Sequence, residues 1–226
     1  MKNKKLCKCG GEGSNNRWYP NRIHDLSKLL EAKIVGDEFH NMRKNMSYNL
    51  QHLEYLDETI KSLSLSSVIL TQNFKIFVII GMSIVECVFF HILKTANDCK
   101  KDEWKVIKKF NNHFELDGKK MQYCTEIKEK MVDPKIVPMG FDTMVNKIKG
   151  RKLLGTNEEI YKDLDLLKTL RNKVHIYDAA ETDYSIFNKK EYDLMRGFLY
   201  QIFTKVIFSC DTDQELMLGF LKLDNC

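Results

Sequence analysis

Proline and glycine are scarce in this sequence, which has three prolines and eleven glycines in 226 residues. That scarcity excludes a collagen-like chain and a chain dominated by linkers. Hydrophobic residues make up 43% of the chain, which excludes a wholly disordered protein. The length suits one ordinary domain with a small appendage. We therefore expect a basic, flexible tail over residues 1–19 and a single folded domain over residues 20–226.

An apolar run is also missing after the charged start MKNKKLCKCGGEGSNN, so we expect no secretory signal. Its seven cysteines are odd in number and scattered, which favours reduced thiols in a cytoplasmic protein. Cys7 and Cys9 resemble half of a zinc knuckle, but no CxxC or HxxxH pair downstream completes it. The sequence therefore predicts neither a metal nor a cofactor.

The net charge of +5 is too small to indicate nucleic-acid binding by itself, but its distribution is uneven. Residues 1–50 carry a net +5 and residues 100–152 a net +6, whereas residues 156–226 carry a net −4. A basic surface that meets RNA is compatible with this pattern, and it would include residues 100–152.

Apolar residues recur at helical spacing along most of the chain. The predicted helices span residues 23–35, about 38–63, 74–93, 141–149, about 156–176 and 191–209. Asn188 is expected to cap the helix over residues 191–209. Thr156 and Glu159 have the capping-box spacing at the start of the helix over about 156–176. This pattern predicts an all-α fold, an up-and-down bundle of four or five long helices.

Residues 74–93 are the most apolar and long enough to cross a bilayer. Lys75, Glu86 and His91 interrupt the run, and its longest uninterrupted part, residues 76–85, has only ten residues. We therefore expect the central buried helix of a bundle and no membrane partner. A membrane-associated helical protein is the alternative.

Residues 100–152 form a predicted insertion on the helical scaffold. Asp117 and Gly118 stand between short alternating runs, which indicates a β-hairpin, and Pro134 and Pro138 bound an irregular passage after it. We expect this insertion to be small.

Common catalytic motifs are missing: the sequence has no GxGxxG, P-loop, HExxH or GxSxG. What remains is the run Leu170-Arg-Asn-Lys-Val-His-Ile-Tyr177. Arg171 and His175 are four residues apart, so on a helix their side chains lie on one surface. Arg171 falls within the apolar stripe of its helix, where a charged group needs a partner. Glu86, the one acid of the apolar helix, is the expected partner.

The residues Arg171, Asn172, His175 and Tyr177, near the end of a helix in an α-bundle, resemble the motif of the HEPN superfamily. Glu86 is similar to the acid that supports the arginine in several members. Only three residues separate Arg171 from His175, one fewer than the usual minimum of the family. The resemblance covers the helical frame, about residues 38–98 and 156–209.

This resemblance implies a metal-independent endoribonuclease with Arg171, His175, Glu86 and Asn172 as its catalytic residues. Tyr177 and Lys173 would contact RNA, and Tyr177 is a residue that a nucleotidyltransferase partner modifies in some related toxin systems. Members commonly pair as homodimers with a composite site, and many act in phage defence, stress responses or beside an antitoxin. The short Arg171–His175 spacing favours the alternative of a bundle without catalysis that serves dimerisation or binds RNA or nucleotides.

Overall fold

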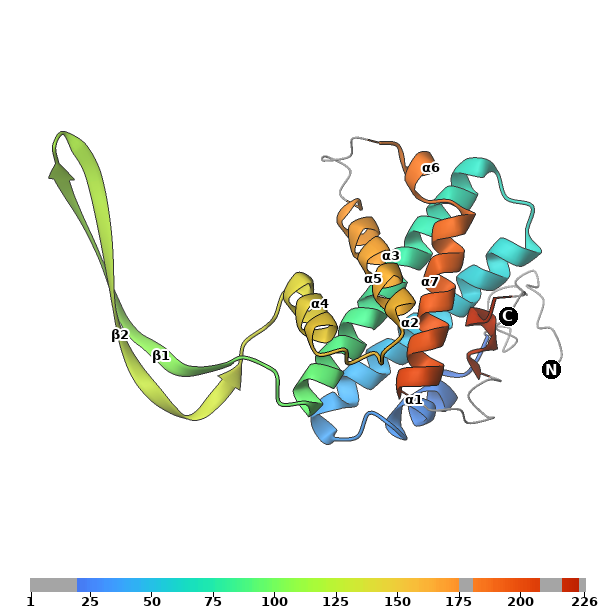
Figure 1. Cartoon of the computed structure of the whole chain (residues 1–226), viewed down its shortest axis with the longest axis horizontal. Coiled ribbons are helices and arrows are strands. Elements are labelled where there is room, and N and C mark those ends of the chain that lie inside the picture. Colours follow the sequence, from blue (N-terminus) through green and yellow to red (C-terminus); the bar gives the residue numbers. More distant parts are fainter. Residues whose placement is uncertain (1–19, 175–180, 208–216, 224–226) are drawn as a thin grey trace, which may run out of the picture.

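The computed structural model describes residues 20–174, 181–207 and 217–223, and within them the chain is mostly helical with one antiparallel hairpin. Four long helices lie side by side as a bundle (Figure 1). They are α2 (His40–Ser62), α3 (Ser67–Thr95), α5 (Glu158–Asn172) and α7 (Lys189–Gln201). The shorter helices are α1 (Ile23–Glu31), α4 (Phe141–Gly150) and α6 (Asp183–Ile186). Single turns at Asp37–Phe39 and Gly219–Leu221 and a π-helical turn at Ile202–Ile207 complete the helical structure described.

Helix α3 is the centre of the bundle and packs against α2, α4, α5 and α7. Phe77, Val85 and Phe89 are fully buried on it, so its apolar sequence supplies the middle of the core. By length and composition it could also cross a membrane, but half of its most apolar 18 residues are buried inside the bundle. The prediction of a central helix is confirmed, although Ile69, Ile76 and Ile79 leave an exposed apolar edge.

The helix boundaries follow polar caps. The side chain of Asn188 accepts a hydrogen bond from the backbone of Lys190, as the sequence predicts. The Asn188 backbone N–H also donates to the carboxylate of Glu191, a contact that was not predicted. At α5 the predicted cap is wrong by one residue. Asn157 rather than Thr156 accepts from the backbone N–H of Glu159, at 3.0 Å. Either cap satisfies a backbone donor that the helix leaves free, so the helix begins close to where it was expected. Its predicted end at about residue 176 is wrong, because α5 ends at Asn172 and does not extend from Arg171 to His175.

The hairpin is confirmed in position but is much longer than predicted. Strand β1 (Lys101–Leu116) pairs with β2 (Lys119–Ile136), and the ribbon projects from one end of the bundle (Figure 1). Asp117 and Gly118 both have positive φ, 52° and 73°, the combination that a two-residue type I′ turn requires. Register irregularities between Asp102 and Trp104 and between Val106 and Lys108 break the alternation of side chains in the half of the hairpin near the bundle.

The expected insertion over residues 100–152 ends earlier than predicted, because α4 belongs to the bundle. Phe141, Met144, Val145 and Ile148 are buried on it, and they pack in the same core as α3. At the hairpin base, Lys147 of α4 donates to the backbone carbonyl and the carboxylate of Asp98, both at 2.9 Å. Arg151 lies 3.2 Å from the same carboxylate. These contacts fix the start of the hairpin to the bundle.

Candidate active site

The candidate site lies at the C-terminal end of α5. Ile160, Leu164 and Leu167 bury one stripe of this helix against the core, whereas Leu170 and Val174 in and after the last turn are only partly buried. The helix ends at Asn172, and Lys173 caps it by donating its backbone N–H to the carbonyl of Leu170. Side chains of the last turn therefore stand at the rim of the bundle.

Arg171 is held at this rim by two neighbouring helices. Its Nη2 lies 3.9 Å from Oε2 of Glu86 on α3, and its guanidinium carbon lies 5.6 Å from the ring centre of Phe141 on α4. Phe141 is itself buried and stacks on Phe89, with 6.2 Å between ring centres and 6° between planes. The guanidinium thus rests on a rigid aromatic surface, with a carboxylate at its edge.

The expected pairing of Arg171 with Glu86 is present, but the expectation that it lies in the core is wrong. The side chains are 44% and 39% exposed, because the last turn of α5 extends past the part of the core that covers it. At 3.9 Å and in contact with water, the ion pair contributes at most about 1 kcal/mol to stability. An arginine in such a position keeps donors free for a second anion.

The other residues predicted for the site are less constrained. Asn172 is exposed, and so is Lys173, whose Nζ lies 3.3 Å from Oε1 of Glu181. His175 and Tyr177 lie outside the described residues, so the structure brings together two of the predicted residues, Arg171 and Glu86. Lys168, one turn before Arg171, pairs with Asp142 of α4 at 3.0 Å. Near this end of α5, Lys168, Arg171 and Lys173 each therefore form an ion pair with a carboxylate.

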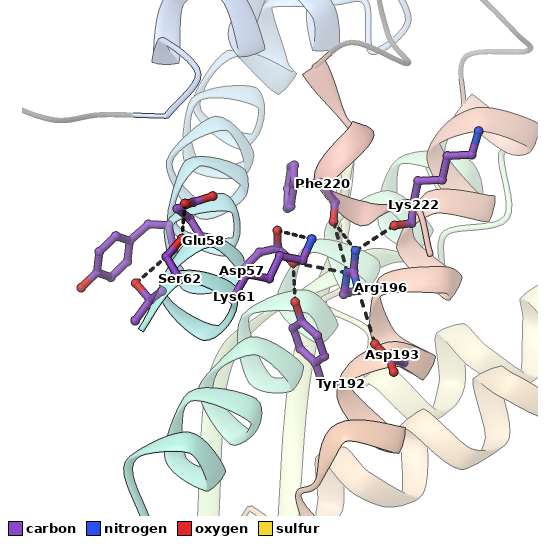
Figure 2. Close-up of polar contacts among 11 residues, drawn as sticks. Asp57, Glu58, Lys61, Ser62, Tyr192, Asp193, Arg196, Phe220 and Lys222 are labelled. Carbon is purple, nitrogen blue, oxygen red and sulfur yellow. Dashed lines mark hydrogen bonds and ion pairs between the residues drawn. The ribbon is translucent and has the colours of Figure 1, made fainter. Parts of the chain in front are cut away.

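The bundle also contains a buried polar cluster that was not predicted from the sequence (Figure 2). Asp57 of α2 and Tyr192 and Arg196 of α7 are each at most 4% exposed. The hydroxyl of Tyr192 donates to Asp57, whose carboxylate also lies 2.9 Å from Lys61 and 3.4 Å from Arg196. Burial, and then the charge of Asp57, raises the pKa of Tyr192.

Arg196 also fixes the C-terminal segment. It donates two hydrogen bonds to the carbonyl of Phe220, at 3.1 and 2.9 Å, and one to that of Lys222, at 2.7 Å (Figure 2). Since its donors go to Asp57 and to backbone carbonyls of the same chain, we interpret this cluster as structural. The sequence does contain a sign of this cluster. A charged residue interrupts an apolar stripe in each of two helices, Asp57 beside Leu56 and Arg196 beside Met195.

The two partly buried thiols in the described part of the chain, Cys87 and Cys99, give no second site. Cys87 follows Glu86 on α3, and burial, followed by the charge of Glu86, raises its pKa. Cys99 lines two cavities of about 400 and 510 Å³ at the hairpin base, and burial raises its pKa as well. A thiol whose pKa is raised is a poor nucleophile at neutral pH. Neither cavity is lined by Arg171 or Glu86.

Within the ranges that the structure describes, no three histidine, cysteine, aspartate or glutamate residues are grouped as a metal site would need. Comparison with known proteins adds no relative. No family model matches the chain, and no curated protein or solved structure is similar to it.

Proposed function

We propose that the chain is a metal-independent endoribonuclease of the HEPN type, which cleaves RNA by attack of the 2′-hydroxyl. The observation that supports it most is the exposed guanidinium of Arg171, held by Glu86 and Phe141 at the end of α5. In the sequence His175 follows Arg171 by four residues, so the same short run supplies a cation and a proton carrier.

The proposed reaction needs no nucleophile from the protein. The 2′-oxygen forms a bond to phosphorus, the bond to the 5′-oxygen breaks, and the products are a 2′,3′-cyclic phosphate and a 5′-hydroxyl. His175 would move the proton, since an imidazole titrates near neutral pH. Arg171 would stabilise the charge on the five-coordinate phosphorus. Glu86 and Asn172 would orient these two residues.

Each chain contains one such histidine, whereas the reaction uses a base and an acid. A homodimer with a composite site would supply both, as the resemblance implies. Tyr177 and Lys173 would contact the RNA, and Tyr177 is the candidate for modification by a nucleotidyltransferase partner. A role in phage defence, in stress or beside an antitoxin, in the cytoplasm and without a membrane, belongs to the same proposal.

Cleavage of a labelled single-stranded RNA by the purified chain in excess EDTA tests this function. We expect cleavage that ends in cyclic phosphate, and a rate at least about 100-fold lower for Arg171→Ala and for His175→Ala. Lys162→Ala is the matched control, because Lys162 is an exposed cation on the same helix away from the site. Equal rates for the control and for Arg171→Ala would contradict the proposed site.

A second candidate function is a HEPN-like bundle without catalysis that binds RNA or a nucleotide. The three-residue spacing between Arg171 and His175 favours it. A folded chain that cleaves none of several RNAs but binds them would support this function instead.

A further inference from the structure

The hairpin of β1 and β2 is strongly amphipathic. In an antiparallel pair, residues directly opposite each other share a face. One face of its outer half carries six large apolar side chains, with Lys108, Asn112 and Thr125 among them on the same face. This apolar face comprises Phe110, Phe114, Leu116, Met121, Tyr123 and Ile127.

Contacts between side chains confirm this assignment. The rings of Phe114 and Tyr123 are 6.0 Å apart, and Asn112, directly opposite Tyr123, donates to its hydroxyl at 3.0 Å. The opposite face carries charge instead: Glu126 lies 3.1 Å from both Lys109 and Lys128. Apolar and charged residues are therefore sorted onto two sides, as in a sheet that covers a core.

The apolar face, however, covers nothing in the single chain. Every residue of β1 is exposed, and in β2 only Met131 and Ile136 are even partly covered. The six side chains of the apolar face are 38–55% exposed. A two-stranded hairpin without a packed face is marginally stable at best in water, so this one needs a cover.

We propose that the cover is the apolar face of the hairpin of a second copy of this chain. A large side chain has roughly 200 Å² of surface, so six that are about half exposed offer about 550 Å². Two identical faces would bury about 1,100 Å², which is enough for a specific interface. A two-fold axis makes such a contact self-complementary.

Charge favours a packing in which the two hairpins point in opposite directions. On β2 the apolar face is bounded by Lys119 at the tip and by Glu129 toward the base, where Lys105 of β1 stands opposite Glu129. A two-fold axis across the strands places Lys119 of each copy over Glu129 of the other. The same axis sets the two bundles at opposite ends, where they do not collide.

This inference does not rest on the proposed nuclease. The packing leaves the helical faces of both bundles free, so it is compatible with a further contact between bundles at a composite site. The two proposals also have separate readouts, the mass of the assembly and the cleavage of RNA, so either can fail alone.

The experiment measures the mass of the full chain in solution, by sedimentation or light scattering, for the wild type and two double variants. Phe114→Lys with Met121→Glu makes the apolar face polar but keeps a cross-strand pair. His113→Lys with Gln122→Glu makes the same change on the opposite face and is the matched control. Helical circular dichroism and thermal unfolding show that each bundle remains folded.

We expect the wild type to have at least twice the chain mass of 26.6 kDa. The apolar-face variant should have half the wild-type mass, and the control should keep it. A monomeric wild type, or an unchanged mass for the apolar-face variant, would overturn the proposal. RNA affinity lost by the apolar-face variant alone, without a change of mass, would show that the face binds RNA and would also overturn it.

A charge reversal tests the direction of packing. Lys119→Glu should weaken the self-association about tenfold, and adding Glu129→Lys should restore most of it. If the second change does not restore association, the hairpins do not pack with their tips in opposite directions.

Discussion

Gly81 of α3 lies directly against Met195 of α7, and a Cβ placed on Gly81 would come within 2.7 Å of the Met195 Cγ. The two helices approach this closely because Gly81 has no side chain, and both residues are in the core. The contact therefore sets the distance between the central helix and the last long helix of the bundle.

Gly81→Ala should destabilise the bundle. Overpacking costs about 1–3 kcal/mol, and the better helix propensity of alanine offsets up to about 1 kcal/mol of that. We expect the free energy of unfolding in urea to fall by up to about 2 kcal/mol. Gly150→Ala is the matched control, because no atom lies within 4 Å of its Cβ position, and its stability should be unchanged or slightly higher.

Met195→Ala should destabilise by about 2–5 kcal/mol through the cavity that it leaves. In the double variant with Gly81→Ala, the new methyl group occupies part of that cavity. The double variant should therefore lose less free energy of unfolding than the two single variants lose together. Strict additivity in urea unfolding would show that the two side chains do not compete for one space.

Alkaline unfolding tests the buried cluster of Asp57, Tyr192 and Arg196. Because the pKa of Tyr192 is raised in the folded chain, the unfolded chain loses this proton first, above about pH 10. The stabilisation of the fold by Tyr192 is thus fully present below that pH and is lost as the pH rises. Tyr192→Phe should lower the free energy of unfolding by about 1 kcal/mol at pH 7, and the difference should shrink above pH 10.

Asp57→Ala should cost more than Tyr192→Phe, up to about 3 kcal/mol, since it leaves the buried guanidinium of Arg196 with Asp193, 3.5 Å away, as its remaining carboxylate. Limited proteolysis provides a second measurement. Arg196 holds the carbonyls of Phe220 and Lys222, so Arg196→Leu should expose the C-terminal segment to cleavage. A segment that stays as resistant as in the wild type would contradict the role of Arg196.

Mildly acidic solution tests His91 on α3. Burial, followed by the charge of Lys94, lowers its pKa, so the unfolded chain takes up a proton first as the pH falls through about 6.5. Its neutral form is stabilised in the fold, where the ring lies edge-on to Phe39 at 4.8 Å. Stability should therefore decline below about pH 6.5.

In His91→Leu the free energy of unfolding should fall less below about pH 6.5 than it does in the wild type. Unfolding measured over a range of pH gives this comparison. His52→Leu changes an exposed histidine of α2 and serves as the control. An identical pH dependence for the wild type and His91→Leu would contradict the assignment.

Local patterns in the sequence predicted much of the fold, because they act over a few residues. Asp117 and Gly118 favour a turn with positive φ, and Asn188 accepts from a backbone donor in the first turn of α7. The partners of a long-range contact are not encoded in this way. Asp57 and Arg196 are 139 residues apart, and either could have faced another charge.

The candidate site shows the same limit. The spacing of α3 and α5 allowed the pairing of Glu86 with Arg171 to be expected, since each is a charge on an apolar helix face. Its exposure could not be read from one helix, because it depends on where the core ends. Phe141 was missed as a partner because α4 seemed to belong to the insertion.

Arg171 provides the prediction that separates a reactive arginine from a structural one. Since its ion pair with Glu86 is half exposed, Arg171→Ala should change the free energy of unfolding by less than about 1 kcal/mol. The same change should lower RNA cleavage at least about 100-fold, and Arg171→Lys should recover little, because lysine lacks the planar fork of donors. Glu86→Gln and Phe141→Leu remove the two supports, so they should lower the rate less than Arg171→Ala does. If Arg171→Ala destabilises the bundle by several kcal/mol, the arginine is a structural residue, and loss of cleavage in this variant would be no evidence for a catalytic role.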